Sequence, residues 1–454
     1  MTPIRSVAPL ALACVLAAGC AAIDPYNLFS RLPPSPGAPG AVPVPAPAHA
    51  GLGRDGRMAA LDFVWTTVNE RYYDPNLNGV DWRAARARWE PLALAAASDE
   101  EFWDLLDRMT GEMRDAHTRV ESPERAAQIE REEAVTPGFT FAPLEGRLVV
   151  TRVDRESDAW WAGVRPGMAL SGVNGEAAQG AYDRALARSR ESSTPQARHR
   201  GAVRRLIGQG EGKRIDLVFT RTDGTALAAA IAPRRVASPP RVTHRTLPSG
   251  LGYIRLTGWA QHLQGRMIAA IEALKDAPGL VIDLRDNPGG SGLMVRNVAA
   301  HFLPKDGKVE LGRTLTRTGK PVTLAFDWIE IIKIRQELEG EGTYAGPVAV
   351  LVNAGSGSGS ELFAAVLQSQ RRGAIVGQTT CGCLLGFLGY AEVPGGGKLA
   401  YSEMGFAFPD GRRIEREGVV PDVSVPLSVS DLAVERDREL EEALAALGRK
   451  ARGA

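Results

Sequence analysis

The sequence lacks several features that would indicate whole classes of function. Its 54 basic and 53 acidic residues give a net charge of +1, so bulk charge does not favour nucleic-acid binding. Beyond the N-terminal stretch, no apolar run reaches the length of a membrane-spanning helix. Of the four cysteines, Cys14 and Cys20 lie in the N-terminal stretch, and the remaining two, Cys381 and Cys383, do not make a disulfide framework. We therefore expect an ordinary globular protein of two or three domains without a nucleic-acid partner.

The first twenty residues have the pattern of an export signal. Arg5 precedes the apolar run VAPLALACVLAA, and LAAGC ends at Cys20. This resembles a bacterial lipoprotein signal, which implies that residues 1–19 are removed and that Cys20 is lipidated. An ordinary secretory signal with an unrelated cysteine is the alternative. Together with the Pro-rich tether over 20–54, the pattern predicts a lipid-anchored protein of the bacterial cell envelope that faces the periplasm.

The rest of the chain divides into regions that differ in their sequence patterns. Residues 55–130 have helical periodicity, as in MAALDFVWTTVNERYYD. Residues 131–236 contain short strands and glycine-rich turns, and residues 237–430 alternate strands with helices before a C-terminal helix or tail over 431–454. This alternation predicts a mainly parallel α/β core for the third region.

The middle region contains TPGFTF and GVRPGMALSGVNG. These segments resemble the PDZ domain, in which a peptide adds a strand to the edge of a sheet. The resemblance implies that backbone amides near Gly138 and Phe139 hold the terminal carboxylate of the peptide. A β-module that joins two domains and binds nothing is the alternative.

Two junctions between a strand and a helix carry the small and polar residues of a candidate active site. DLRDNPGG ends one strand and presents glycine amides that can hold an anion or a developing oxyanion. NAGSGSGSE occupies the equivalent junction one unit later, with Ser358 in the turn before the helix. The helix dipole favours a reactive hydroxyl at that position.

Five segments in order resemble the signature segments of the C-terminal processing peptidases and the tricorn core protease: GYIRL, VIDLRDNPGG, LVNAGSGSGSELFAAVLQ, IVGQTTCG and EGVVPD. The resemblance covers about residues 58–426 and implies an α/β, crotonase-like superhelix. It also implies that Ser358 is the nucleophile of a serine peptidase acting on protein or peptide substrates, with no cofactor and no metal. The amide of Gly359 and an amide of Gly289 or Gly290 would hold the oxyanion.

The base departs from the Ser-Lys pattern of the processing peptidases. TTCGCLLG has Cys383 where that pattern has lysine, and no lysine lies between Glu361 and Gly397. Lys398 would need a different strand register to serve. A Ser-Lys mechanism is therefore not expected.

MRDAHTRV and RRIEREGVVPD match the tricorn-type branch, which resembles a Ser-His-Glu hydrolase. The resemblance implies that His117 is the base and that Glu415, or less well Glu417, orients it. The alternatives are a histidine that caps a helix end and a glutamate paired with Arg412 or Arg413. The remaining histidines are weaker candidates because they lie in the tether, in polar stretches or on a packed helix: His49, His199, His244, His262 and His301.

Cys381 and Cys383 permit several interpretations. A Cys-x-Cys metal site lacks further ligands, and a nucleophilic cysteine is unnecessary beside the serine motif. A packed pocket wall or a local disulfide fits the pair better.

Two functions from other classes remain open beside the envelope serine endopeptidase that we expect. One is a non-catalytic peptide-binding lipoprotein, a pseudopeptidase in which Cys383 marks lost activity. The other is a crotonase-like enzyme that acts on acyl thioesters. The export signal argues against the latter, since acyl-CoA substrates are cytosolic.

Overall fold

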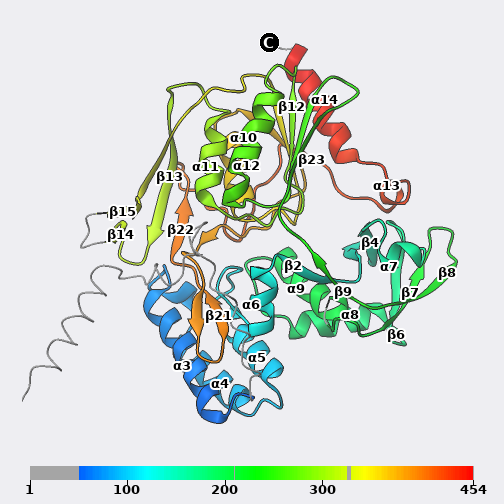
Figure 1. The fold of residues 1–454 in the computed structure, drawn as a ribbon, viewed down its shortest axis with the longest axis vertical. Coiled ribbons are helices and arrows are strands. Elements are labelled where there is room, and N and C mark those ends of the chain that lie inside the picture. Colours follow the sequence, from blue (N-terminus) through cyan, green and yellow to red (C-terminus); the bar gives the residue numbers. More distant parts are fainter. Residues whose placement is uncertain (1–50, 209, 325–328, 453–454) are drawn as a thin grey trace, which may run out of the picture.

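The computed structural model describes residues 51–208, 210–324 and 329–452, called the described residues below. The predicted signal, Cys20 and nearly all of the tether lie outside them. Figure 1 shows a helical region at the lower left, a β-rich region at the lower right and an α/β region above both. None of the helices in the described residues is long and apolar enough to cross a bilayer.

The α/β region is built on a six-stranded sheet in which only β10 runs antiparallel to its neighbour. In spatial order the strands are β10 (Val242–Thr246), β11 (Gly252–Leu256), β12 (Leu280–Asp283), β17 (Val348–Val352), β18 (Gly373–Gly377) and β23 (Val423–Ser424). The mainly parallel core that the sequence predicted is confirmed.

Helices cover both faces of this sheet. Because side chains alternate along a strand, Ile282 and Val350 face one layer while Val281 and Leu351 face the other. The first layer contains α10 (Gln264–Ala273), α11 (Gly292–Ala300) and α12 (Gly359–Ser369), and the second contains α14 (Arg438–Arg452). A further sheet extends the first layer, in the order β16 (Arg335–Glu339), β13 (Lys308–Thr316), β22 (Met404–Ala407) and β19 (Leu385–Gly386), and the hairpin of β14 (Val322–Leu324) and β15 (Ile329–Ile332) follows β13.

The helical region is completed by strands from far along the chain. Its helices are α3 (Arg54–Arg71), α4 (Trp82–Leu94), α5 (Asp99–Gly111) and α6 (Pro123–Glu130). After α5, β1 (Arg119–Glu121) pairs with β21 (Gly397–Ala400), which pairs in turn with β20 (Ala391–Val393). Val393 and Leu399 lie in the same hydrophobic cluster as the helices. Local periodicity over 55–130 could not reveal these partners.

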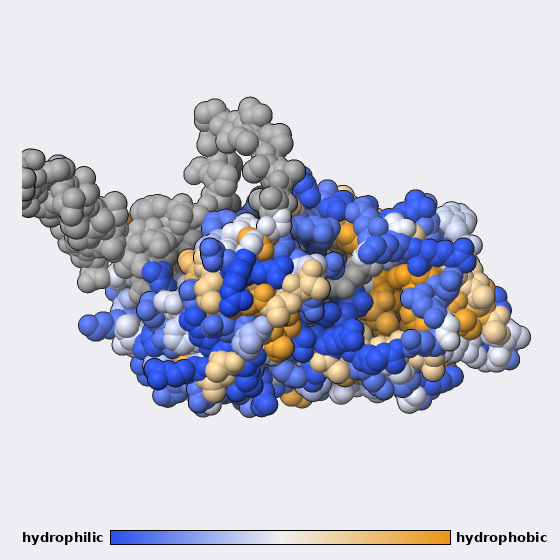
Figure 2. Space-filling view, turned by 90° about the horizontal axis from the view of Figure 1, so that it is seen from below, coloured by the Kyte–Doolittle hydropathy of each residue, from blue (hydrophilic) through white to orange (hydrophobic). Residues whose placement is uncertain are grey.

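The β-rich region is a six-stranded sheet accompanied by three helices. Its strands are β3 (Phe139–Leu144), β4 (Arg147–Val153), β5 (Ala169–Val173), β7 (Ile215–Thr220) and β8 (Ala226–Ile231), with β6 (Glu176–Ala177) beside β5. Its helices are α7 (Asp158–Trp161), α8 (Ala178–Arg188) and α9 (Pro195–Ile207). The chain enters and leaves through β2 (Glu133–Thr136) and β9 (Arg234–Ala237), which pair with each other. Seen from below, the surface is mainly hydrophilic, and hydrophobic residues gather in a hollow over this region (Figure 2).

Candidate active site

The two motif-bearing loops lie side by side because they follow neighbouring parallel strands, β12 and β17. The backbone carbonyl of Asn287 joins them: it accepts the N–H of Gly357 and the hydroxyl of Ser360, both at 3.0 Å. The loop between β12 and α11 therefore forms a wall beside the turn that carries Ser358.

Ser358 stands at the turn between β17 and α12 with a backbone conformation that only glycine adopts readily. Its φ of 50° and ψ of −113° are unusual for a residue with a Cβ, and such a conformation costs about 1–3 kcal/mol. Its N–H is donated to Glu361 Oε2 at 2.8 Å. A serine kept in a strained turn at a helix start is typical of a nucleophile elbow.

Glu361 is a fully buried carboxylate that organises this turn. Oε2 accepts the N–H groups of Ser358 and Cys383, at 2.8 and 2.9 Å. Oε1 accepts the Thr380 hydroxyl and the Gly382 N–H, both at 2.6 Å. Burial raises the pKa of this carboxyl, and the four hydrogen bonds oppose that effect. Glu361 was not predicted as a site residue, although its position three residues after Ser358 has the capping-box spacing.

The predicted oxyanion donors are only partly available. The N–H of Gly289 is donated to Asn287 Oδ1 at 3.0 Å, so Gly289 is not a free donor and Gly290 is the remaining alternative of the two. Gly289 instead allows close approach, since a Cβ there would lie 2.6 Å from Cβ of Ser358. The N–H groups of Gly290 and Gly359 have no acceptor among the described residues. A Cβ on Gly359 would lie 3.4 Å from the Gly290 nitrogen, so these two donors lie close together.

Cys381 and Cys383 form a disulfide and are both buried. Neither sulfur is therefore a free thiol. A Cβ on Gly357 would lie 3.4 Å from Cβ of Cys381, which places the disulfide against the nucleophile turn. Arg200 of α9 donates to Sγ of Cys381 at 2.8 Å, so the β-rich region also contacts this loop.

His117 lies in the loop between α5 and β1, and Asp115 holds this loop in place. Oδ1 of Asp115 accepts the backbone N–H of His117 at 2.7 Å, and Oδ2 accepts the hydroxyls of Thr118 and Ser402, at 2.5 and 2.6 Å. Ser402 follows β21, which pairs with β1. The His117 loop is therefore held at the ends of these two paired strands.

The structure brings His117 to Ser358. Nε2 of His117 is 3.3 Å from Oγ of Ser358, across 241 residues of sequence. Burial lowers the pKa of His117 to about 4; Asp115 opposes this effect, and nearby arginines such as Arg119 add to it. At neutral pH the imidazole is therefore uncharged and able to accept a proton. If Nε2 accepts the Ser358 hydroxyl, Nδ1 carries the proton, and Nδ1 is buried without a partner among the described residues.

Glu415 does not make the predicted hydrogen bond to His117. Both carboxylate oxygens of Glu415 are buried and lack a partner among the described residues. The pKa of this carboxyl is raised to about 8, mainly by burial and also by the charge of Asp115, while the nearby Ser193 hydroxyl opposes the shift. A protonated, unpaired carboxyl does not stabilise an imidazolium, so the third member of the proposed triad is incomplete in this state. Glu417, the weaker alternative, is exposed.

Other candidates are engaged elsewhere. Lys398 forms ion pairs with Glu130 and Glu392, away from the nucleophile turn. His301 contacts the Thr343 hydroxyl at 2.7 Å. The remaining histidines of the described residues lie outside the site: His199 in the β-rich region, and His244 and His262 on the exposed surface.

The predicted carboxylate-binding loop is also partly occupied. The N–H of Gly138 is donated to the Thr136 hydroxyl at 3.0 Å, and the Gly138 carbonyl accepts the Asp154 N–H at 2.8 Å. Gly138 is therefore not a free donor for a peptide carboxylate. Phe139 begins β3 and lines a cavity between β3 and α9.

Comparison with known families gives two matches. The model of peptidase family S41 matches residues 250–425, and that of the tricorn protease C1 domain matches residues 55–111. The first range contains both motif-bearing loops, and the second contains α3, α4 and α5.

Curated relatives agree with these matches. A carboxyl-terminal-processing protease of Synechocystis sp. is 25% identical over 394 residues, which cover 84% of each chain. Carboxyl-terminal-processing peptidase 3, chloroplastic, of Arabidopsis thaliana is 27% identical over 382 residues, covering 81% of this chain and 68% of the relative. Two tricorn protease homologues of Streptomyces coelicolor are each 26% identical, and the chain spans only 32% and 34% of their lengths.

Solved structures share the fold. Mature CPAF superposes with a TM-score of 0.66 at 16% identity, covering 87% of this chain and 98% of that chain. The photosystem II D1 C-terminal processing protease gives 0.51 at 22% identity, covering 84% and 96%. The mixed α/β fold with an N-terminal helical region is thus the fold of these peptidase structures.

Proposed function

Because the chain belongs to peptidase family S41 and is a serine-type peptidase, we propose that it is an endopeptidase in which Ser358 attacks the scissile carbonyl and His117 is the general base. The observation that carries this proposal is the distance of 3.3 Å between His117 Nε2 and Ser358 Oγ. That distance is within the range of an apo nucleophile–base pair, which is often loose before substrate binds.

The proposed first step forms an acyl-enzyme. Oγ of Ser358 bonds to the carbonyl carbon as its proton passes to Nε2 of His117, and the imidazolium then gives that proton to the leaving amine. A water molecule repeats the sequence on the ester and releases the acid. The depressed pKa of His117 supports the first half of this cycle, since the free base is uncharged at neutral pH.

The oxyanion is assigned to the N–H groups of Gly359 and Gly290. Both lack an acceptor among the described residues and lie close to one another. Gly359 is also the first residue of α12, so the positive end of the helix dipole adds to this stabilisation.

Glu415 is proposed to hold Nδ1 of His117 when substrate is bound. Two buried polar groups without partners, a donor at Nδ1 and an acceptor at the carboxylate, support this assignment because such groups rarely stay unpaired in a functional state. Ionisation of the carboxyl is part of this rearrangement, since the pKa of Glu415 is about 8 in the free protein.

The β-rich region is proposed to be a PDZ-like domain that engages the substrate. β3 is an edge strand of its sheet, which suits addition of an extended peptide. The catalytic region is proposed to be of the crotonase type. Its parallel sheet, with a helix following each of β11, β12 and β17, supports that assignment.

The cell envelope is the proposed location, with Cys20 as a lipid anchor facing the periplasm. The support is the LAAGC sequence and the Pro-rich tether after it. Mass spectrometry of the mature N-terminus tests this part of the proposal: a diacylated Cys20 supports it, and an unmodified N-terminus beyond Cys20 removes it.

Cleavage of denatured casein tests the activity itself. The wild-type protein should convert casein to peptides, and Ser358→Ala should not. Equal cleavage by both proteins would show a contaminating protease or another nucleophile, and absence of cleavage by both would favour the non-catalytic alternative. The unpaired Glu415 carboxyl is the observation that keeps that alternative in view.

A further inference from the structure

The open edge of β3 carries a carbonyl that faces away from the sheet. Phe141 is paired opposite Val150 of β4. The N–H and C=O of Val150 are bonded to Met168 and Gly167 on the far side of β4, at 2.8 and 2.9 Å. Phe141 and Val150 are therefore a non-hydrogen-bonded pair, and the N–H and C=O of Phe141 face the edge, where an added strand would bind.

His199 of α9 already occupies that carbonyl. Its Nε2 lies 3.0 Å from the Phe141 oxygen, and its Nδ1 lies 2.9 Å from the Tyr182 hydroxyl. Because a carbonyl can only accept, Nε2 carries the proton and Nδ1 accepts from Tyr182. The ring also makes edge contacts with Phe141 and tilted contacts with Tyr182. Although His199 lies in a polar stretch of sequence, both of its ring nitrogens are therefore engaged by protein groups.

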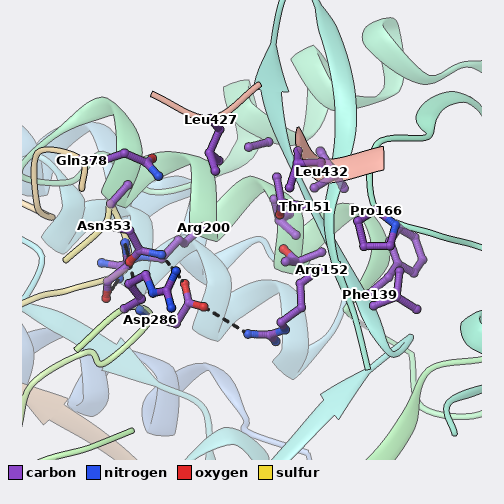
Figure 3. Close-up of a pocket in the computed structure, with 18 of the residues that line it drawn as sticks. Phe139, Thr151, Arg152, Pro166, Arg200, Asp286, Asn353, Gln378, Leu427 and Leu432 are labelled. Atoms are coloured by element: carbon purple, nitrogen blue, oxygen red, sulfur yellow. Dashed lines mark hydrogen bonds and ion pairs between the residues drawn. The ribbon is translucent and has the colours of Figure 1, made fainter. Parts of the chain in front are cut away.

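Phe141 and His199 line a cavity that extends toward the nucleophile turn. The cavity has a volume of about 810 Å³ and lies between β3 and α9, with Phe141, His199 and Val203 in its wall. In Figure 3, Phe139, Pro166 and Leu432 stand at one end, and Asp286, Asn353 and Gln378 at the other. Gly355, three residues before Ser358, also lines it. An extended chain lying along β3 would thus be directed to the catalytic region.

We propose that His199 closes the β3 edge in the free protein and that an extended segment of substrate polypeptide displaces it. The inference rests on the proposed engagement of substrate by the β-rich region. A backbone N–H of the segment replaces Nε2–H of His199 as the donor to the Phe141 carbonyl. The His199 side chain changes its rotamer, and α9 itself does not move. The ligand class is an unfolded polypeptide with a free backbone N–H at that position, so proline is excluded there.

Binding of fluorescein-labelled denatured casein to the full chain tests this inference. The measurement is made by fluorescence anisotropy in the Ser358→Ala background, so that casein stays intact. His199→Ala removes the competing donor and should lower the Kd by about fivefold, the effect expected for one neutral hydrogen bond. His199→Gln keeps an N–H donor at a similar reach and should bind like the parent. His301→Ala, a histidine bonded to Thr343 in the α/β region, is the matched control and should change nothing.

A second variant protects the test against a folding defect at position 199. Tyr182→Phe keeps the histidine but removes the hydroxyl that holds Nδ1, so it should lower the Kd in the same direction by a smaller factor. In the active background, His199→Ala should lower KM with kcat unchanged. An unchanged or higher Kd in folded His199→Ala, or undetectable casein binding in it, overturns the inference. Failure of wild-type protein to cleave casein would instead remove the proposed function, and these two failures are read from different measurements.

Discussion

The two halves of the candidate site differ in how completely their polar groups are satisfied. On the nucleophile side, the Glu361 carboxylate accepts four hydrogen bonds and joins the Ser358 turn to the disulfide loop. On the base side, Nδ1 of His117 and both oxygens of Glu415 are buried without partners among the described residues. The buried carboxylate of the nucleophile side is fully hydrogen-bonded in the free protein, whereas the base side keeps buried polar groups without partners among the described residues.

The difference follows from where the residues come from. Ser358 and Glu361 are three residues apart on one turn of the α/β region. The base side is assembled from His117 in the helical region, Glu415 in the α/β region and Ser193 before α9, whose hydroxyl accepts the Ala116 N–H at 2.9 Å. The position of the nucleophile is therefore set by local sequence, while the position of the base depends on how three regions dock.

The largest expected effect comes from removing the base. His117→Ala should reduce kcat by about 10⁶-fold, as for members of other serine triads, because the imidazole that contacts the Ser358 hydroxyl is lost. Steady-state cleavage of casein measures the loss. The exposed His262→Ala is the control and should retain wild-type turnover. A His117→Ala enzyme within tenfold of wild type would exclude His117 as the base.

Removing the buried Glu361 carboxylate should destabilise the nucleophile side of the site. Glu361→Ala leaves four donors without an acceptor and should lower the free energy of unfolding by about 3 kcal/mol. Urea unfolding followed by circular dichroism measures this quantity, with exposed Gln370→Ala at the end of α12 as control. A loss equal to that of the control would mean that solvent or neighbouring groups replace the carboxylate.

Ionisation of Glu415 on the base side should be visible in the pH dependence of kcat/KM. Glu415 ionises as pH rises through its pKa of about 8, and only the anion stabilises the imidazolium, so kcat/KM should increase through that pH. Glu415→Gln should resemble wild type below pH 7 and fall behind by about 10- to 100-fold at pH 9, the value of a hydrogen bond to a charged group. Parallel profiles for the two proteins would show that Glu415 does not act in catalysis.

The smallest effect concerns strain in the nucleophile turn. Since Ser358 has a φ of 50°, Ser358→Gly relieves a penalty that Ser358→Ala retains. The free energy of unfolding of the glycine variant should therefore be about 1 kcal/mol higher than that of the alanine variant. Differential scanning calorimetry of the two inactive proteins makes the comparison. Equal stabilities would mean that Ser358 is not strained.

The sequence predicted those parts of the site that short motifs record. The alternation of apolar strands and helices predicted the parallel sheet, and the order of motifs led to Ser358 and His117. It could not show that Asn287 takes the Gly289 N–H or that Thr136 takes that of Gly138, because such bonds depend on loop conformation.

Long-range packing explains the other omissions. β1 pairs with β21, which is separated from it by more than half of the chain, and neither strand has a sequence pattern that predicts the pairing. His199 has polar neighbours in sequence, yet the helix α9 turns it toward β3. The role of His199 depends on this tertiary contact and has no local signal in the sequence, whereas the spacing of Glu361 from Ser358 is a capping signature.

Labelling by a fluorophosphonate tests the central claim most directly, since the reagent reacts only with a serine activated by a base. Tryptic mass spectrometry should find the adduct on Ser358 in wild-type protein, and the rate of labelling should fall by several orders of magnitude in His117→Ala. Labelling of His117→Ala at the wild-type rate would contradict the pairing that the 3.3 Å contact indicates. An adduct on another residue, or none in a preparation that cleaves casein, would contradict the assignment of Ser358.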